Sequence, residues 1–408
     1  MHILFLTDNF PPEGNAPATR TYEHACEWVK LGHKVTVITC APNFPEGRVF
    51  EGFNNSFYSR SMMNGIDLIR VKTFISSNEG FVLRILDFIS FMFSSFLAGL
   101  FQRNVDVIVA TSPQLFTAVS GWALSAIKRK KYVFELRDIW PASITAVGAM
   151  EESFAIKLLE KLEMFLYRRA DAIVAVTQSF KKELVERGVN SDKISVVLNG
   201  VDLSKYHPAT QKNEEFSTRY QLENKFVIGY IGTHGLAHAL EHVIDAAEKL
   251  NDNDNIRFIF AGGGAAKEKL IELVKQKQLN NVVFIPRQPK ENMPAIWSLC
   301  DVSLISLRDT PLFKTVIPSK IFESMGMGLP MLAAMPHGEA THIIESANAG
   351  VICKPENAEV LAEHVINMFD SKDKMVEYKN HSMNAADNYD RKVMAINMLN
   401  GLEKLIKK

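Results

Sequence analysis

Apolar residues recur along this chain in short unbroken runs, separated by longer stretches in which they return every three or four positions. The first such unit comprises the run HILFL at residues 2–6, a loop with Gly and Pro, a helical stretch and the run KVTVITC at residues 34–40. Gly32 lies where a left-handed C-cap of the helix is expected. The pattern predicts a strand, a helix and a second, parallel strand. The expected apolar face of the helix comprises Tyr22, Ala25, Cys26 and Val29.

The same alternation continues to Asn199 and resumes after a polar, turn-rich interval. The apolar runs are IDLIRV, DVIVAT, YVFELRD, DAIVAVT and ISVVLN before the interval, and FVIGYIG, IRFIFAGGG, VVFIP, DVSLISL and PMLAA after it. Strands this apolar are buried on both faces, which indicates parallel sheets covered by helices. The chain is therefore predicted to be an α/β protein with two Rossmann-like, doubly wound domains facing a central cleft, where the carboxyl ends of the strands gather ligands.

The length supports two domains, because 408 residues exceed the size at which a single hydrophobic core keeps growing. We expect an N-terminal domain at residues 1–200, a linker at residues 201–225 and a C-terminal domain at residues 226–380. Residues 381–408 are expected to form a C-terminal helix that can pack back on the N-terminal domain.

Composition narrows the classes of partner. Lys and Arg together number 46, as do Asp and Glu, so the overall charge gives no reason to expect nucleic acid. The four cysteines lack metal-ligand spacing and no HExxH motif occurs, so no metal site is expected. Reduced cysteines and the lack of signal-peptide features at the N-terminus predict a cytoplasmic protein.

Two predicted loops in the first domain carry candidate chemistry. Gly14 and Asn15 lie between a strand and a helix, where the backbone can approach an anion, although any α/β turn needs such residues. In the segment ELRDIWP, Arg137 and Asp138 follow an apolar strand. Arg137 would bind phosphate or polarise a hydroxyl, and Asp138 would orient an acceptor. The alternative is a structural Arg and Asp pair that closes the strand end.

Glycine-rich turns end the first two predicted strands of the second domain. Gly232 and Thr233 end the run FVIGYIGT, and Gly262 and Gly263 lie in AGGG before a helix. Such turns expose backbone N–H groups to phosphate. The sequence lacks G-x-G-x-x-G after its first strand and contains no G-x-x-x-x-G-K-[ST], which weighs against dehydrogenases and P-loop proteins.

The segment IPSKIFESMGMGLP is the most informative. Pro318 and Ser319 suit the start of a helix, and Lys320 and Glu323 follow one turn apart. Lys320 and the first amides of the helix would bind a diphosphate, and Glu323 would accept hydrogen bonds from ribose hydroxyls. The alternative is a surface ion pair between the two side chains, worth about 0.2–0.5 kcal/mol.

Together these segments resemble the family 4 retaining glycosyltransferases of the GT-B fold, over nearly the whole chain. NAPATRTYEH and SPQLFTAVSG narrow the resemblance to WbuB-like enzymes of O-antigen and capsule synthesis, in particular the N-acetyl-L-fucosamine transferases. The motifs that carry the wider resemblance are TDNFPPEGNAPATR, ELRDIWP, ADAIVAVTQSF, LNGVDLSKYHP, AGGG and PSKIFESMGMGLP.

The resemblance implies a UDP-sugar donor bound mainly to the second domain, no separate cofactor, and an undecaprenyl-diphosphate-linked saccharide as acceptor on the first domain. Glu323 matches the second glutamate of the family's E-x7-E motif, but the first position is Thr315, so the motif is broken. The Arg and Lys that often follow the first strand of the second domain are replaced by GTHGLAH. Lys320, Arg287 and Lys314 are then the candidates to bind the diphosphate.

A membrane surface is the last expected partner. Residues 88–101 carry no charge, but they fall short of the ~20 residues of a spanning helix, so we expect an interfacial or buried helix. Lys128, Arg129, Lys130 and Lys131 would contact anionic lipid. A core helix and a solvated basic turn are the alternative. The predicted location is the inner face of the bacterial plasma membrane, with peripheral attachment.

Two other functions remain open at this point. A nucleotide-sugar epimerase of the GT-B fold would share the architecture, but it needs acid and base carboxylates that ELRDIWP and PSKIFE match less well. A non-catalytic nucleotide-sugar-binding subunit would be consistent with the broken E-x7-E motif.

Overall fold

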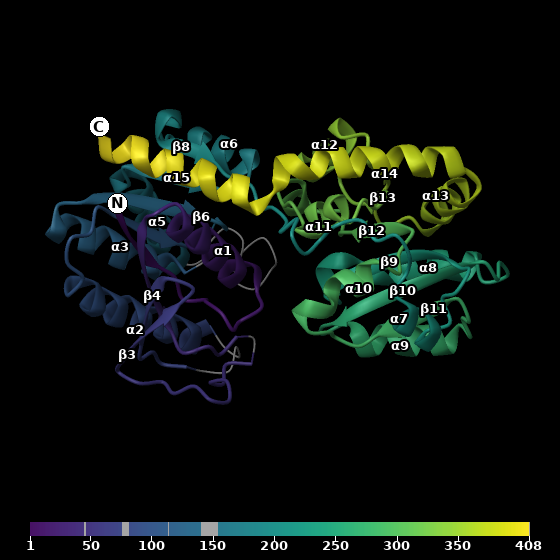
Figure 1. The fold of residues 1–408 in the computed structure, drawn as a ribbon, viewed down its shortest axis with the longest axis horizontal. Helices are drawn as coiled ribbons and strands as arrows, with labels where there is room; N and C mark the ends of the chain where they lie inside the picture. Colours follow the sequence, from purple (N-terminus) through teal and green to yellow (C-terminus); the bar gives the residue numbers. More distant parts are fainter. Residues whose placement is uncertain (45, 76–80, 113, 140–153, 408) are drawn as a thin grey trace. The chain divides into compact units, whose positions relative to one another are not determined.

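The computed structural model describes residues 1–44, 46–75, 81–112, 114–139 and 154–407. These residues form two compact units (Figure 1): unit 1 contains Met1–Asn199 and Arg391–Lys408, and unit 2 contains Gly200–Asp390. Both are built on predominantly parallel sheets, which confirms the predicted α/β class.

Unit 1 is organised around an eight-stranded sheet with the order β3-β4-β2-β1-β5-β6-β7-β8. All neighbouring strands are parallel except β3, which is an antiparallel edge strand beside β4. The strands are β1 (His2–Leu6), β2 (Lys34–Cys40), β3 (Tyr58–Met63), β4 (Ile66–Val71), β5 (Val107–Thr111), β6 (Lys131–Leu136), β7 (Ala172–Ala175) and β8 (Ile194–Val196). Their carboxyl ends meet at one edge of the sheet, where ligands of such folds bind.

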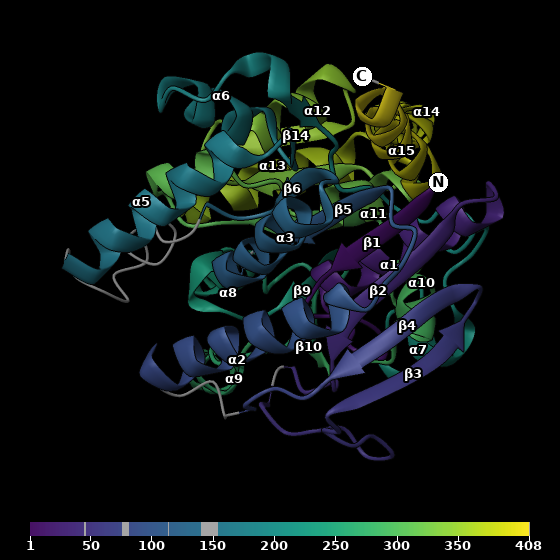
Figure 2. The ribbon, with the colours of Figure 1, turned by 90° about the vertical axis from the view of Figure 1, so that its left-hand side faces the viewer.

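Helices cover both faces of this sheet (Figure 2). One apolar layer contains side chains of α2 (Phe81–Leu100), α3 (Leu115–Lys128), α5 (Phe154–Arg169) and α6 (Gln178–Glu186). The opposite layer contains side chains of α1 (Ala16–Lys30) and α15 (Arg391–Lys407). Burial on both faces explains why the strand segments are continuously apolar.

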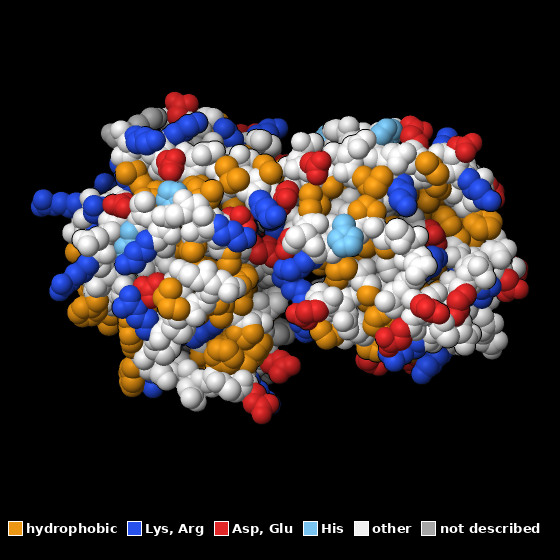
Figure 3. Space-filling view, in the orientation of Figure 1, with side chains coloured by type: hydrophobic (Ala, Val, Ile, Leu, Met, Phe, Trp, Pro, Cys, Tyr) orange, Lys and Arg blue, Asp and Glu red, His pale blue; other side chains and the backbone are white. Residues whose placement is uncertain are grey.

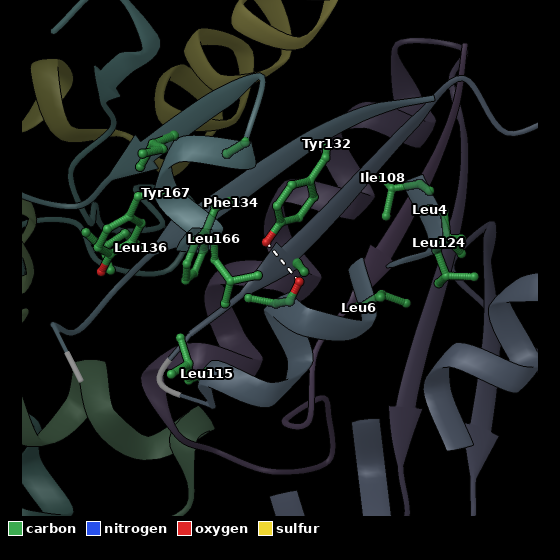
Figure 4. Close-up of a cluster of buried hydrophobic side chains, with 14 of the residues drawn as sticks. Leu4, Leu6, Ile108, Leu115, Leu124, Tyr132, Phe134, Leu136, Leu166 and Tyr167 are labelled. Atoms are coloured by element: carbon green, nitrogen blue, oxygen red, sulfur yellow. Dashed lines mark hydrogen bonds between the residues drawn. The ribbon is translucent and has the colours of Figure 1, made fainter. Parts of the chain in front are cut away.

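Large side chains fill the first of these layers (Figure 4). Phe134 and Tyr167 pack with tilted rings, whose centroids are 5.2 Å apart. Tyr132 is fully buried, and its hydroxyl donates a hydrogen bond of 3.0 Å to the carbonyl of Ala118 on α3. This bond satisfies the polar atom of Tyr132 and ties α3 to the sheet.

Unit 2 contains a six-stranded, fully parallel sheet with the order β11-β10-β9-β12-β13-β14. The chain order of these strands, 3-2-1-4-5-6, is that of a Rossmann fold. The strands are β9 (Phe226–Thr233), β10 (Ile256–Gly263), β11 (Val282–Ile285), β12 (Val302–Ser306), β13 (Met331–Ala334) and β14 (Gly350–Cys353). The principal helices are α7 (Glu214–Arg219), α8 (Leu240–Lys249), α9 (Lys267–Gln276), α10 (Met293–Trp297), α11 (Lys320–Gly326), α12 (Glu339–Ser346), α13 (Ala358–Asp370) and α14 (Lys372–Ala386).

The chain passes between the units twice, which differs from a single linker at residues 201–225. Residues 201–225 belong to unit 2, where α7 is formed and Val201 pairs with Asp390 in a parallel bridge. This bridge brings the outgoing and returning chain together. The terminal region expected at residues 381–408 is divided, because α14 belongs to unit 2 and α15 belongs to unit 1.

The returning helix α15 is anchored to α1. The indole of Trp28 is fully buried, and its Nε1 donates a hydrogen bond of 2.9 Å to the carbonyl of Ala395. Arg391 forms an ion pair of 2.5 Å with Glu23 at the start of α15. The apolar contact and the indole bond together hold the C-terminal helix on the sheet.

Replacing Trp28 with Ala should lower the free energy of unfolding by about 3–5 kcal/mol, because a large buried ring and its hydrogen bond are both lost. Urea unfolding followed by far-UV circular dichroism measures the change. Leu31→Ala is the matched control at the C-cap of the same helix, since Leu31 is 50% exposed. Equal midpoints for the two variants would show that α15 is not anchored through Trp28.

Candidate functional site

In unit 2, the carboxyl ends of β9 and β10 approach each other so closely that only glycine fits. A Cβ added to Gly262 would lie 2.0 Å from the carbonyl oxygen of Gly232, and one added to Gly264 would lie 2.5 Å from the carbonyl oxygen of His234. Gly232, Gly262 and Gly264 all have positive φ angles, from 139° to 149°. Glycine is therefore required here by backbone geometry and by space.

Lys320, the first residue of α11, brings its amine to this edge. Its side chain is buried, and a Cβ added to Gly232 would lie 3.4 Å from Nζ. The Nζ lies 3.7 Å from the centre of the Tyr230 ring and has no hydrogen-bond partner among the described atoms. Burial lowers the pKa of Lys320 to about 7, although Glu323 opposes this shift. The structure thus excludes the surface ion pair between Lys320 and Glu323 and leaves a buried amine available to an anion.

His234 and His238 flank the same amine. His234 is fully buried, and neither of its ring nitrogens has a hydrogen-bond partner within the described part of the chain. Burial lowers the pKa of both histidines to about 4, with a further contribution from the charge of Lys320. Both are therefore uncharged at neutral pH.

Glu323 lies one turn after Lys320 and is partly exposed. Its Oε2 accepts a hydrogen bond of 3.3 Å from Nε1 of Trp297, which is fully buried on α10. The indole thereby fixes the direction of the carboxylate. Gly326 ends α11 and Gly328 has a φ of 64°, as expected for the glycine-rich exit toward β13.

Helix α11 starts at Lys320, with Ser319 as its N-cap, and its first turn is closed by backbone hydrogen bonds. The N–H groups of Ile321, Phe322 and Glu323 donate to the carbonyls of Pro318 and Ser319, at 3.1–3.2 Å. These three amides are therefore occupied within the turn, and the proposed part of Pro318, Ser319 and Lys320 in diphosphate binding stays a prediction.

Three other predicted donor contacts lie at the surface of unit 2. Arg287, Lys314 and Thr233 are exposed. Lys267, which the sequence reasoning did not consider, donates from Nζ to the carbonyl of Gly262 at 2.9 Å. Gly263 has open space around it, so its backbone is accessible. The roles of these residues in donor binding stay predictions.

In unit 1, Arg137 and Asp138 follow β6 at the edge where ligands are expected. Their backbone N–H groups donate to the hydroxyl oxygen of Ser112, at 2.8 and 3.2 Å. Nη1 of Arg137 is buried and has no partner in the described ranges, and burial lowers its pKa to about 10, so the guanidinium remains charged at neutral pH. Trp140 and Pro141 of the same motif lie outside the described residues.

The neighbouring Glu135 has a structural role. Its buried carboxylate accepts a hydrogen bond of 2.9 Å from Arg20 on α1. Arg20 also donates to the carbonyls of Val197 and Leu198, at 2.9 and 2.7 Å, so it joins three segments of unit 1. Burial and the nearby arginines hold the pKa of His24 well below its usual value.

The loop before α1 shows a capping role for Asn15. Its Oδ1 accepts a hydrogen bond of 2.9 Å from the N–H of Ala18, and its amide donates to Asn9. Gly14 is exposed and has open space where a side chain would stand. The cap accounts for Asn15, and the proposed part of both residues in donor binding stays a prediction.

Comparison with known families decides the identity of the chain. Residues 17–205 match the model of Glycosyltransferase Family 4, and residues 212–385 match that of Glycosyl transferases group 1. The chain is a GT-B glycosyltransferase of this type. The enzyme class is that of hexosyltransferases, which confirms the expected glycosyltransferase activity. The narrower resemblance to WbuB-like enzymes and the retaining mechanism stay predictions.

The glycosyltransferase is similar to two curated bacterial proteins over most of its length. It is 26% identical to the putative colanic acid biosynthesis glycosyl transferase WcaI of Escherichia coli K12, over 88% of this chain and 90% of that protein. It is 25% identical to the probable glycosyltransferase WbjE of Pseudomonas aeruginosa, over 67% and 68%.

Solved structures share its fold. HepE of Anabaena in complex with UDP aligns with a TM-score of 0.73 and 17% identity, covering 99% of this chain and 100% of that chain. WaaG, a glycosyltransferase involved in lipopolysaccharide biosynthesis, aligns with a TM-score of 0.69 and 14% identity, covering 98% and 99%.

The apolar helix α2 of the glycosyltransferase has one buried side and one exposed side. Phe91 and Ala98 pack in the core, while the exposed apolar residues are Leu83, Leu86, Phe93 and Leu97, followed by Phe101 after the helix. Within the described ranges, Leu83–Leu100 is the one helical segment long and apolar enough to cross a membrane, and 28% of it is buried. Figure 3 shows apolar side chains over the lower part of unit 1, where Figure 1 draws α2 and β3.

Some side chains of the basic run at residues 128–131 are engaged in contacts within unit 1. Nζ of Lys128 donates to the carbonyls of Leu100 and Gln102, at 2.9 and 2.7 Å, and so caps the end of α2. Lys131 pairs with Asp171 at 3.3 Å. Two of the four basic side chains are thus engaged within unit 1, and the exposed ones are Arg129 and Lys130.

Lys320→Met should stabilise the ligand-free glycosyltransferase by a few kcal/mol at pH 6, because folding no longer buries an ammonium without a counter-charge. The pKa of Lys320 falls from 10.5 to about 7 on folding. The penalty is therefore complete below about pH 7 and disappears toward pH 10.5, where both states are neutral.

Urea unfolding at pH 6 and pH 9 measures this difference, with Lys275→Met as control because Lys275 is exposed on α9. A stability gain that does not shrink at pH 9 would contradict the assignment.

Proposed function

We propose that the enzyme is a retaining glycosyltransferase that moves a sugar from a UDP-sugar to a lipid-linked saccharide during synthesis of a cell-surface polysaccharide. The observation that carries the proposal is the buried amine of Lys320, without a partner among the described atoms, at the glycine-rich ends of β9 and β10. A buried cation of this kind requires an anion, and the diphosphate of the donor supplies one. HepE, which shares the fold, was solved with UDP and with UDP-glucose.

The related proteins support the class of product. WcaI is named for colanic acid biosynthesis. TuaH of Bacillus subtilis, which is 24% identical over 49% of this chain, is named for teichuronic acid biosynthesis. The narrower sequence resemblance points to N-acetyl-L-fucosamine, or a related N-acetylated hexosamine, as the sugar. An undecaprenyl-diphosphate-linked saccharide is the proposed acceptor, and O-antigen or capsule is the proposed product.

The proposed mechanism assigns positioning and charge stabilisation to the protein. Lys320 stabilises the departing diphosphate, and Glu323, oriented by the Trp297 indole, accepts hydrogen bonds from the ribose. The departing diphosphate takes the acceptor proton on the face from which it leaves, so the anomeric configuration is retained and no covalent enzyme intermediate forms. Arg137 and Asp138 of unit 1 orient the acceptor.

We further propose that the enzyme works in the cytoplasm, attached peripherally to the inner face of the plasma membrane. The exposed apolar side of α2 supports this location, since an apolar helix face inserts at the level of the lipid head groups. Arg129 and Lys130 supply positive charge on the turn after α3, and each contributes about 1 kcal/mol against anionic lipid.

Glu323→Ala should weaken UDP binding about 10- to 100-fold and abolish most sugar transfer, because the variant loses hydrogen bonds between a carboxylate and the ribose. A thermal-shift titration with UDP, GDP and TDP measures binding, and release of UDP from a UDP-N-acetylhexosamine in the presence of acceptor measures turnover. Glu268→Ala is the control, since Glu268 is exposed on α9. Wild-type turnover by a folded Glu323→Ala protein would reject the role of Glu323.

Phe93→Asp combined with Leu97→Asp should abolish most sedimentation with anionic liposomes at all salt concentrations, because both side chains lie on the exposed face of α2. Arg129→Ala combined with Lys130→Ala should remove only the part of the liposome binding that is lost at high salt. Val376→Asp in unit 2 is the control, as Val376 is 58% exposed. Unchanged sedimentation of the α2 variant would show that this face does not contact lipid.

A further inference from the structure

The basic side chain buried at the glycine-rich edge of the proposed donor site is that of Lys320, and its amine has no hydrogen-bond partner among the described atoms. We propose, on the basis of the proposed donor function, that a nucleoside diphosphate binds this site together with one proton from solution, which Lys320 receives. Donor affinity then depends on pH through the protein.

The surroundings of Lys320 explain why the free amine favours its neutral form. Its amine lies over the ring of Tyr230, at 3.7 Å from the centroid. A ring face attracts an ammonium far more weakly than a carboxylate or a phosphate does. Glu323 is the anion that opposes the loss of charge, and burial outweighs it, so that the pKa of Lys320 lies at about 7.

Of the other basic groups around Lys320, the two histidines are neutral and Lys267 is engaged with a backbone carbonyl. His234 and His238 remain uncharged at neutral pH, because burial holds the pKa of each at about 4. Lys267 on α9 directs its ammonium to the carbonyl of Gly262. Among His234, His238 and Lys320, Lys320 is therefore the group whose protonation state changes between pH 7 and pH 9.

A bound diphosphate reverses the preference of Lys320 for its neutral form. Its negative charge favours the ammonium over the neutral amine, which raises the pKa of that group in the complex. Enzyme molecules in which Lys320 was neutral before binding must then take up a proton. Linkage requires the association constant to fall with rising pH, approaching about tenfold per pH unit once most free protein is neutral.

Calorimetric titration of the full-length enzyme with UDP tests the proposal, in pairs of buffers with different ionisation enthalpies, at pH 7.5 and 8.5. The terminal phosphate of UDP has a pKa of about 6, so UDP itself binds no proton in this range. We expect uptake of close to one proton per UDP at pH 8.5, and a smaller uptake at pH 7.5.

Lys320→Arg is the decisive variant, because a guanidinium remains charged throughout this range. We expect it to bind UDP without proton uptake and with an affinity that does not change from pH 7.5 to 8.5. Lys275→Arg, at an exposed position of α9, should behave as the wild type.

The outcomes separate this inference from the donor assignment. Wild-type binding without proton uptake, or with an affinity independent of pH, overturns the inference and leaves the proposed function intact. If proton uptake persists in Lys320→Arg, the proton must bind to His234 or His238 instead. That result overturns the role of Lys320. Failure of UDP, GDP and TDP all to bind the wild-type enzyme contradicts the proposed function itself.

Discussion

The contact between the backbones of Gly232 and Gly262 determines what the donor edge of unit 2 can contain. With 2.0 Å between a possible Cβ and a carbonyl oxygen, no side chain can stand between these strand ends. Positive charge for an anion must therefore come from another element, and Lys320 brings it from α11. Because the lysine approaches over the Tyr230 ring and away from water, its amine is desolvated before any ligand arrives.

Most strands of the two sheets could be predicted from apolar runs, because a strand that is buried on both faces is apolar along its whole length. One edge strand of each sheet, β3 and β14, was missed for the opposite reason. In β3 (Tyr58–Met63) all but the last residue are exposed, and β14 (Gly350–Cys353) has four residues, of which only Cys353 is buried. Such strands form because a neighbouring strand offers hydrogen bonds. The residue types of a short or exposed segment do not indicate this pairing.

The site was predictable where a residue's role follows from its neighbours in the chain. Lys320 and Glu323 were selected because they start a helix that ends in glycines. His234 could not be selected in this way, since its burial depends on the distant Gly264 and on aromatic rings from β9, β10 and β11. Similarly, the pairing of Arg20 with Glu135 joins residues 115 positions apart, and sequence spacing carries no information about it.

The return of the chain to unit 1 has a consequence for the order in which the protein is made. Helix α15 (Arg391–Lys407) covers part of one face of the sheet of unit 1, yet the ribosome synthesises it after all of unit 2. Until then, the apolar positions of α1 that pack against α15, including Trp28, lack their cover. Unit 2 is continuous in sequence and can fold as soon as Asp390 has emerged, whereas the domain that begins first is completed last. Nascent unit 1 is thus a natural client for chaperones throughout translation of unit 2.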